Sequence, residues 1–161
     1  LRLPLAVSYD EENLFLAVRV PDETHIQLWS PSDAWRGDSI QIGIAREEKY
    51  ARGEWQKLCF SLSDQDHAVG FCHEGSDKQR GILSAEKVPF SIFRGETETR
   101  YEVAVPWAWL GYNTRPVRLR LGLLINMVDQ ENGQPGERKM FDPFGGMFWG
   151  QPEDFASLRL E

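Results

Sequence analysis

Two tryptophans and one amide are the side chains of this sequence best suited to hold a polar ligand. Trp35 stands just before a run that alternates polar and apolar residues, and Trp149 stands just before the last such run of the chain. Both indoles are expected beside loops, and Gln41 falls on the polar face of the first run. A flat indole next to amides and carboxylates is the combination that a sugar requires. The alternative is that both indoles pack beneath loops, since tryptophan is usually mostly buried.

The elements that position these side chains are predicted to be strands. In the run that follows Trp35, Ile40, Ile42 and Ile44 share one face, which is typical of a half-buried strand. Many short alternating runs follow one another, with turn residues between them. The predicted strands are 1–9, 14–20, 39–44, 55–62, 68–72, 82–83, 90–93, 100–106, 117–128 and 155–160.

This pattern predicts an all-β fold, an antiparallel β-sandwich of immunoglobulin-like or jelly-roll type. Pro106 to Gly111 predicts one short helical turn, with Pro at its start and Gly after its end. Residues 129–148 are polar and rich in Gly and Pro, which predicts a loop of about 20 residues, a length that is often functional. We expect residues 1–161 to form a single domain cut from a longer chain. The residues predicted to fill the space between the sheets are Ile40, Ile42, Ile44, Val103, Val105, Leu121 and Leu123.

The two cysteines, Cys59 and Cys72, fall in a predicted hairpin formed by residues 55–62 and 68–72. A two-residue loop at Gln65-Asp66 would set the two cysteines directly opposite each other, at a spacing that a disulfide can bridge. A register that differs by one residue would separate them. A disulfide at this position would indicate an exported protein. No C-x-x-C pair supports a zinc or thioredoxin-like site.

Composition excludes several partners. The chain has a net charge of −7 and its Lys and Arg residues are scattered, which argues against nucleic acid and against an anionic membrane surface. No apolar run approaches the roughly 20 residues of a membrane-spanning helix. Aromatic residues make up 12% of the chain and include six tryptophans, an enrichment that the proposed ligand site would explain in part.

Four motifs occur together in the order found in the family 9 carbohydrate-binding modules. They are Trp35-x-Gly-Asp-Ser-Ile-Gln-Ile, Tyr101-Glu-Val-Ala-Val-Pro-Trp107, Asn126-x-x-Asp129 and Trp149-Gly-x-Pro152. The chain therefore resembles that family, which belongs to a wider group of sugar- and haem-binding sandwiches. The resemblance covers nearly the whole chain.

The resemblance implies a non-catalytic domain in which two tryptophans clamp the end of an oligo- or polysaccharide at one edge of the sandwich. Trp35 and Trp149 match the two clamp positions, and Gln41 matches a position that is commonly Glu in sugar-binding members. Strand parity adds Lys57, which would share the face of Gln41 if the two strands are neighbours. The implied setting is an accessory domain of a larger exported protein, extracellular or periplasmic, whose other partners are the domains of its parent chain. The family also carries structural calcium, but no acidic turn here has a defined ligand spacing.

Other functions are weighed against this one. Relatives of the sandwich hold haem b through Met with His or Lys, and the chain offers Met127, Met140 and Met147 together with His25, His67 and His73. A glycosidase would need two converging carboxylates, and no pair is marked by sequence. Ser32, Asp33 and a histidine do not form the nucleophile elbow of a hydrolase. A last alternative is a protein-interaction module whose exposed aromatic residues meet another domain.

Overall fold

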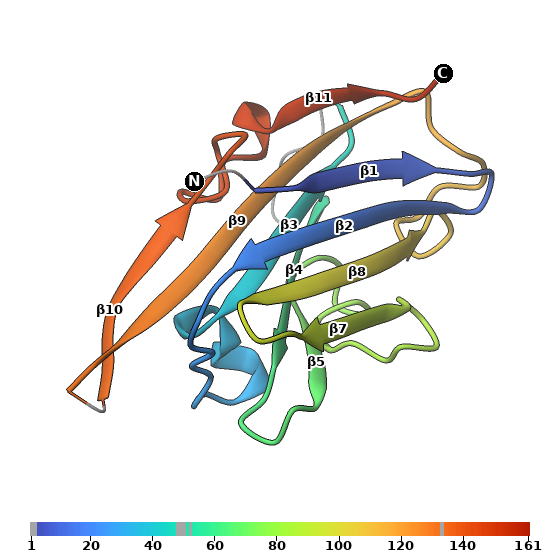
Figure 1. Cartoon of the computed structure of the whole chain (residues 1–161). Coiled ribbons are helices and arrows are strands. Elements are labelled where there is room, and N and C mark those ends of the chain that lie inside the picture. The colour runs from blue at the N-terminus through green and yellow to red at the C-terminus, as the bar shows by residue number, and fades with distance from the viewer. Residues whose placement is uncertain (1–2, 48–50, 52, 133) are drawn as a thin grey trace.

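The strands of the protein form two antiparallel sheets, as the computed structural model shows for residues 3–47, 51, 53–132 and 134–161 (Figure 1). The smaller sheet has four strands, in the order β1 (Leu5–Tyr9), β2 (Asn13–Pro21), β8 (Glu98–Pro106) and β7 (Phe90–Arg94). The larger sheet has seven strands. Six follow the order β10 (Gln134–Phe141), β9 (Arg118–Glu131), β3 (Ser39–Ala45), β4 (Trp55–Leu62), β5 (Ala68–Glu74) and β6 (Gly81–Ile82), and β11 (Ala156–Arg159) pairs with β9.

The two sheets pack face to face around one hydrophobic core (Figure 1). All seven residues predicted for this core are buried, none of them more than 4% exposed. Each predicted strand is present, with its ends moved by a few residues, and residues 1–2 of the first predicted strand lie outside the described residues. The prediction of an antiparallel β-sandwich is therefore confirmed, because the period-2 alternation reports directly which face of each strand leaves water.

Strand β3 is central to the larger sheet, between β9 and β4, and every one of its residues is buried. Its isoleucines enter the core, so Ser39, Gln41, Gly43 and Ala45 point to the outer face. On that face Gly43 lies opposite Lys57 of β4 and Gly122 of β9. A strand buried on both faces needs a second covering layer, and the candidate site lies in that layer.

The predicted helical turn after Pro106 is a hydrogen-bonded turn rather than a helix. The Leu110 N–H donates to the Pro106 carbonyl at 3.2 Å, and Gly111 takes a φ of +80°, which favours glycine. Short 3-10 helices form instead at Pro31–Arg36 and Pro152–Asp154, in segments that the sequence pattern left irregular. Each begins with a proline, whose fixed φ suits a first helical position.

The predicted loop of residues 129–148 is wrong over most of its length. Strand β9 continues to Glu131, and β10 pairs back along it, with Arg138 opposite Val128 and Met140 opposite Asn126. β10 is an edge strand that carries charged residues on both faces and a register shift after Pro135, so it shows no apolar alternation. Residues 142–155 remain outside the strands, and they include the short helix Pro152–Asp154.

The predicted cysteine hairpin is present, but its register is one residue away from the predicted one. Cys59 lies opposite Phe71, Cys72 lies opposite Leu58, and both thiols are free. The chain turns through three residues, 64–66, because the Ser63 N–H donates to the His67 carbonyl at 2.8 Å and Asp66 adopts a φ of +57°. One residue of slip sends the two side chains to opposite faces of the sheet, so the disulfide prediction is wrong.

We expect two thiols per chain in a titration with a thiol reagent in denaturant without reductant. In the native protein at pH 8 both should react slowly, because burial raises the pKa of Cys59 and of Cys72 to about 12. A denatured chain with no titratable thiol would contradict the register and restore the disulfide.

Candidate functional site

A pocket with a volume of about 650 Å³ lies over the outer face of the larger sheet. Five adjacent strands, from β10 to β5, contribute to its floor, and two irregular segments form its walls. The prediction was for a slot at the edge of the sandwich, whereas the lining residues cross the sheet. They are Trp35, Gln41, Trp55, Lys57, His73, Glu74, Leu124, Asn126, Arg138, Met140, Phe148, Trp149 and Gly150.

The floor of the pocket is built around Gln41. Its side chain leaves the outer face of β3, and the β3–β4 register puts Lys57 on the same face, as strand parity predicted. Gln41 is only 3% exposed, yet among the described residues its amide has no hydrogen-bond partner. The amide atoms of Gln41 are not among the fully buried unpaired atoms, so they can reach the pocket and form hydrogen bonds with a polar ligand there.

Two more polar groups border the pocket without a partner among the described residues. The Asn126 amide nitrogen donates to Ser39 Oγ at 3.1 Å, but its Oδ1 is buried and accepts no hydrogen bond. His73 packs its ring against Phe71 at 4.9 Å and leaves Nε2 buried and unpaired. Together with Gln41, these groups give the pocket more hydrogen-bonding capacity than the protein itself uses.

One wall of the pocket is Trp35, which the short helix Pro31–Arg36 carries. The helix ends at Gly37, where a side chain could not fit because a Cβ would lie 2.6 Å from the Ile26 carbonyl oxygen. The Arg138 guanidinium lies over the Trp35 ring, 4.7 Å from its centroid, and donates to the Trp35 carbonyl at 3.0 Å. Trp35 is half-buried, and its indole is thus held beneath a cation.

A second part of the lining is Trp149, which is 75% exposed. Its ring meets the edge of Phe148, with 4.6 Å between the centroids. The turn before it is fixed by Asp142, whose two carboxylate oxygens accept the N–H groups of Gly145 at 2.8 Å and Phe148 at 3.1 Å. The exposed indole of Trp149 is therefore held by hydrogen bonds of the turn before it rather than by its own burial.

A pair of glycines anchors the segment that carries Trp149. Gly43 and Gly122 lie opposite each other on the outer face, and Met147 and Phe155 fill the space above them. A Cβ on Gly43 would lie 2.6 Å from the Phe155 ring, and one on Gly122 would lie 2.8 Å from Met147 Sδ. Only glycine leaves room for Met147 and Phe155 to pack directly on the sheet. The two glycines therefore determine the position of the segment that carries Trp149.

The charges in the pocket are mostly positive. Lys57 and Arg138 have no ion-pair partner among the described residues, whereas the Glu74 carboxylate pairs with Arg80 at 3.3 Å. Burial is the main reason that the pKa of Lys57 is below its usual value, and the Arg138 charge acts in the same direction. Burial likewise lowers the pKa of Arg138, with a further contribution from Arg36. Two cations that repel each other line a pocket with one carboxylate that is already paired.

All four residues predicted for the site, Trp35, Gln41, Lys57 and Trp149, line this one pocket. Sequence reasoning missed Arg138, because the polar, Gly- and Pro-rich pattern of residues 129–148 predicts a loop where β10 lies. It also missed the unpaired groups of His73 and Asn126. Asn126 could have been found from the sequence, because it is the first residue of the motif Asn126-x-x-Asp129. The role of these residues toward a ligand remains a prediction.

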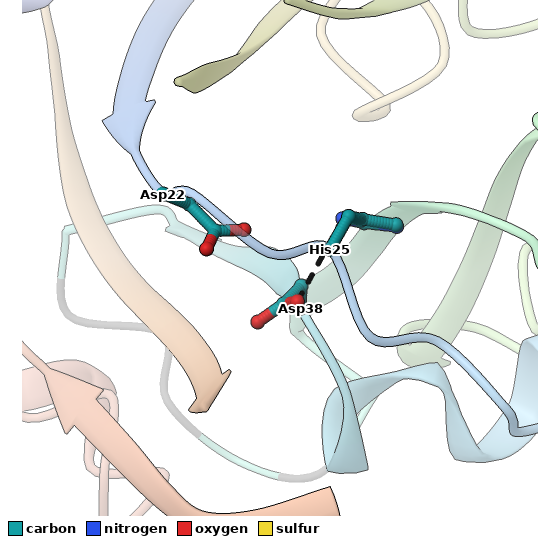
Figure 2. A group of neighbouring side chains, drawn as sticks. All are labelled: Asp22, His25 and Asp38. Atoms are coloured by element: carbon teal, nitrogen blue, oxygen red, sulfur yellow. Dashed lines mark ion pairs between the residues drawn. The ribbon is translucent and has the colours of Figure 1, made fainter. Parts of the chain in front are cut away.

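Apart from the pocket, one cluster of titratable groups in the described ranges of the chain could hold a cation. Asp22, His25 and Asp38 place one ligand atom each within 4.8 Å of one another (Figure 2). Calcium takes six to eight oxygen ligands, and this cluster offers two carboxylates and an imidazole. Asp22 Oδ2 is 3.3 Å from Arg94, and both oxygens of Asp38 accept backbone N–H groups. The cluster therefore does not fit the structural calcium that the family resemblance implied.

Asp38 has a structural role that these contacts explain. Its side chain accepts the N–H groups of Ile26 and Val128, the latter at 2.7 Å, and so joins the segment before the Trp35 helix to strand β9. Burial raises the pKa of Asp38 to about 7, although these two hydrogen bonds lower it in part. The Gly-Asp pair that precedes β3 thus fixes the base of the Trp35 wall.

Comparison with solved structures gives the fold. Two structures of a family 9 carbohydrate-binding module from Caldicellulosiruptor kristjanssonii, one in complex with glucose and one with cellotriose, both match with a TM-score of 0.69. Each is 11% identical and covers 99% of this chain, which spans 76% and 75% of the two solved chains. A structure from Bacteroides uniformis ATCC 8492 matches with a TM-score of 0.58, 11% identity, and coverage of 99% of this chain and 78% of its own.

No family model and no curated protein matches the sequence itself. The likeness is therefore one of fold, and it confirms the sandwich of the family 9 modules that the four sequence motifs predicted.

We expect the Gly122→Ala substitution to reduce the free energy of unfolding by about 1–3 kcal/mol, because the new methyl group forces Met147 away from the sheet. Urea unfolding measures this, and the fluorescence of Trp149 should change with it. Gly95→Ala is the matched control, since its Cβ would find its nearest neighbour at 3.5 Å. Equal stability of the two variants would contradict the anchoring role.

We expect the stability difference between wild type and Asp38→Asn to shrink as pH rises from about 4 to about 7. An unfolded Asp ionises near pH 3.8, whereas folded Asp38 stays protonated up to about pH 7, so its contribution is full below pH 3.8 and is lost through that window. Chemical unfolding at pH 4, 5.5 and 7 measures it. The exposed Asp77→Asn is the control, and a difference that does not change with pH would contradict the argument.

Proposed function

We propose that this protein binds carbohydrate without catalysing a reaction, with a sugar residue held in the pocket between Trp35 and Trp149. The observation that carries the proposal is the pocket itself. Two aromatic walls stand over a floor in which the Gln41 amide, Asn126 Oδ1 and His73 Nε2 lack partners among the described residues.

The chemistry of the pocket matches a pyranose ring. The C–H faces of a sugar pack on aromatic rings, and its hydroxyl groups both donate and accept hydrogen bonds. A pocket with unpaired amide and imidazole groups favours such a ligand, because Asn126 Oδ1 and His73 Nε2 are buried from water without a partner among the described residues. The solved modules of the same fold are complexes with glucose and cellotriose, which supports a saccharide as the class of ligand.

Two features favour binding over hydrolysis. A glycosidase needs two carboxyl groups about 5–10 Å apart on either side of the scissile bond. Among the described residues that line the pocket, Glu74 is the single acid, and it is paired with Arg80. If Glu74 acted as the general acid, no second carboxylate among these residues could act as the nucleophile or the general base.

The haem alternative remains testable at the same pocket. Met140 lines it together with His73 and Lys57, which are the residue types that the alternative requires. Met147 is excluded from such a role by its packing on Gly43 and Gly122, and His25 bonds the Leu62 carbonyl at 3.0 Å. We favour the sugar because the unpaired amides have no function toward haem. A Soret band in the purified protein would reverse this choice.

The setting of the domain is also part of the proposal. We propose an accessory domain of a larger protein that acts outside the cell or in the periplasm, where polysaccharides occur. The free cysteines remove the disulfide as support for export. Within the described part of the chain, no helix is long and apolar enough to cross a bilayer.

We expect a glycan array to identify bound saccharides, and Trp149→Ala and Trp35→Ala each to weaken that binding by about 2 kcal/mol or more, which is roughly 30-fold. Gln41→Ala should weaken it by about 1 kcal/mol, as for one neutral hydrogen bond. Calorimetry measures all three. Phe93→Ala is the control, because Phe93 is an aromatic residue 62% exposed on the smaller sheet.

Two outcomes would contradict the proposed function. One is an array on which no glycan binds. The other is binding that the Trp35→Ala and Trp149→Ala variants leave unchanged, which would locate the ligand elsewhere and make the protein an interaction module of another kind.

A further inference from the structure

Two unneutralised cations in the pocket call for an explanation. The protein carries a net charge of −7, so a random surface depression would be expected to be acidic or neutral. The lining instead contains Lys57 and Arg138, neither of which has an ion-pair partner among the described residues. The one carboxylate, Glu74, is already paired with Arg80 at 3.3 Å.

The Arg138 guanidinium is held where a ligand on the Trp35 wall must meet it. It lies 4.7 Å from the centroid of the Trp35 ring and donates through one Nη to the Trp35 carbonyl. Within the part of the chain that the structure describes, its other N–H groups have no acceptor, so they can form a bidentate contact with a carboxylate or sulfate group, which a guanidinium fits well. Its position on an edge strand, β10, keeps it accessible from the mouth of the pocket.

Lys57 approaches from the other side of Gln41. Its strand, β4, and that of Arg138 are separated by β3 and β9, so the two cations flank the neutral amide rather than meet at one point. Lys57 is half-buried, and burial of an unpaired ammonium is unfavourable unless an anion neutralises it. Glu74 lies opposite Lys57 in the β4–β5 register and its charge acts on Lys57, but its ion pair is with Arg80.

From this arrangement we infer that the pocket selects acidic saccharides, in which a carboxylate or sulfate ester is placed against Arg138 or Lys57 and a pyranose ring packs on the tryptophans. This inference rests on the proposed function and adds the charge of the ligand to it. A neutral sugar can bind to the same walls and amides, but it leaves both cations without a counter-charge. The acidic sugar therefore gains the charge-assisted hydrogen bonds that the neutral one lacks.

The test compares matched sugars by calorimetry on the intact chain. Methyl glucuronide, methyl glucoside and methyl glucoside 6-sulfate share one ring and differ in one group. We expect the uronate or the sulfate to bind about tenfold more tightly than the neutral glucoside, as for a hydrogen bond to a charged group, and this preference should fall as salt rises from 0.02 to about 0.5 M. If the glucuronide binds more tightly than the 6-sulfate, the preferred group is a carboxylate; the reverse order indicates a sulfate ester. Acidic and neutral oligosaccharides of equal length extend the comparison.

Two variants locate the preference. Arg138→Gln and Lys57→Gln should each reduce the ratio of acidic to neutral affinity; both affinities are measured on the same variant, so a general loss of binding leaves the ratio unchanged. Lys139→Gln is the matched control, because this residue is the neighbour of Arg138 on the same strand, points to the other face and pairs with Asp129. It removes the same overall charge and should leave the ratio unchanged. Arg138→Lys separates charge from the stacking on Trp35, since it retains the first and loses the second.

The outcomes separate the two levels of the argument. If neutral saccharides bind as tightly as acidic ones, or the ratio survives both Gln variants, the charge selectivity is overturned and the proposed function stands. If neither acidic nor neutral saccharides bind, the proposed function fails and this inference fails with it. If Lys139→Gln reduces the ratio as much as the pocket variants do, the effect is one of net charge and the inference is again overturned.

Discussion

Burial of strand β3 on both faces is the constraint on which the rest of the structure depends. Its isoleucine face is satisfied by the core between the sheets, but its outer face carries Ser39, Gln41, Gly43 and Ala45, all of which are also buried. A sheet of this kind ordinarily leaves its outer face in water. Here the segment from residue 142 to residue 155 covers one half of that face, and the pocket occupies the other half.

The covering segment and the pocket therefore both lie over the outer face of β3, which is buried. Where the outer face carries glycine, at Gly43 and Gly122, apolar side chains from the covering segment pack directly on the backbone. At Gln41, two residues before Gly43 on the same face, no group of the described residues forms a hydrogen bond with the side chain, and the amide keeps its hydrogen-bonding capacity. The same contact that completes the small outer core also fixes the turn that presents Trp149.

Sequence patterns predicted those parts of the molecule that burial determines. The alternation of Ile40, Ile42 and Ile44 identified the core face, and strand parity put Lys57 on the face of Gln41, because side-chain direction has a fixed period of two residues. The predictions that were wrong depended on the geometry of one turn or on a strand at the edge of the sheet. One left-handed residue, Asp66, moved the cysteine register, and a charged edge strand with no apolar face hid β10 and hence Arg138.

The electrostatics of the pocket follow from one residue type at the centre of its floor. At the position of Gln41, the sugar-binding members that the chain resembles commonly carry Glu, whose negative charge would offset neighbouring cations. An amide of the same shape preserves the hydrogen bonds but not the charge, so the balance at the floor is left to Lys57 and Arg138. In a half-buried site the field of these two cations is screened less than at the surface. In the proposed function, the neutral amide at the centre of β3 leaves Lys57 and Arg138 to favour an acidic ligand, while the walls, the strands and the glycine anchor stay as they are.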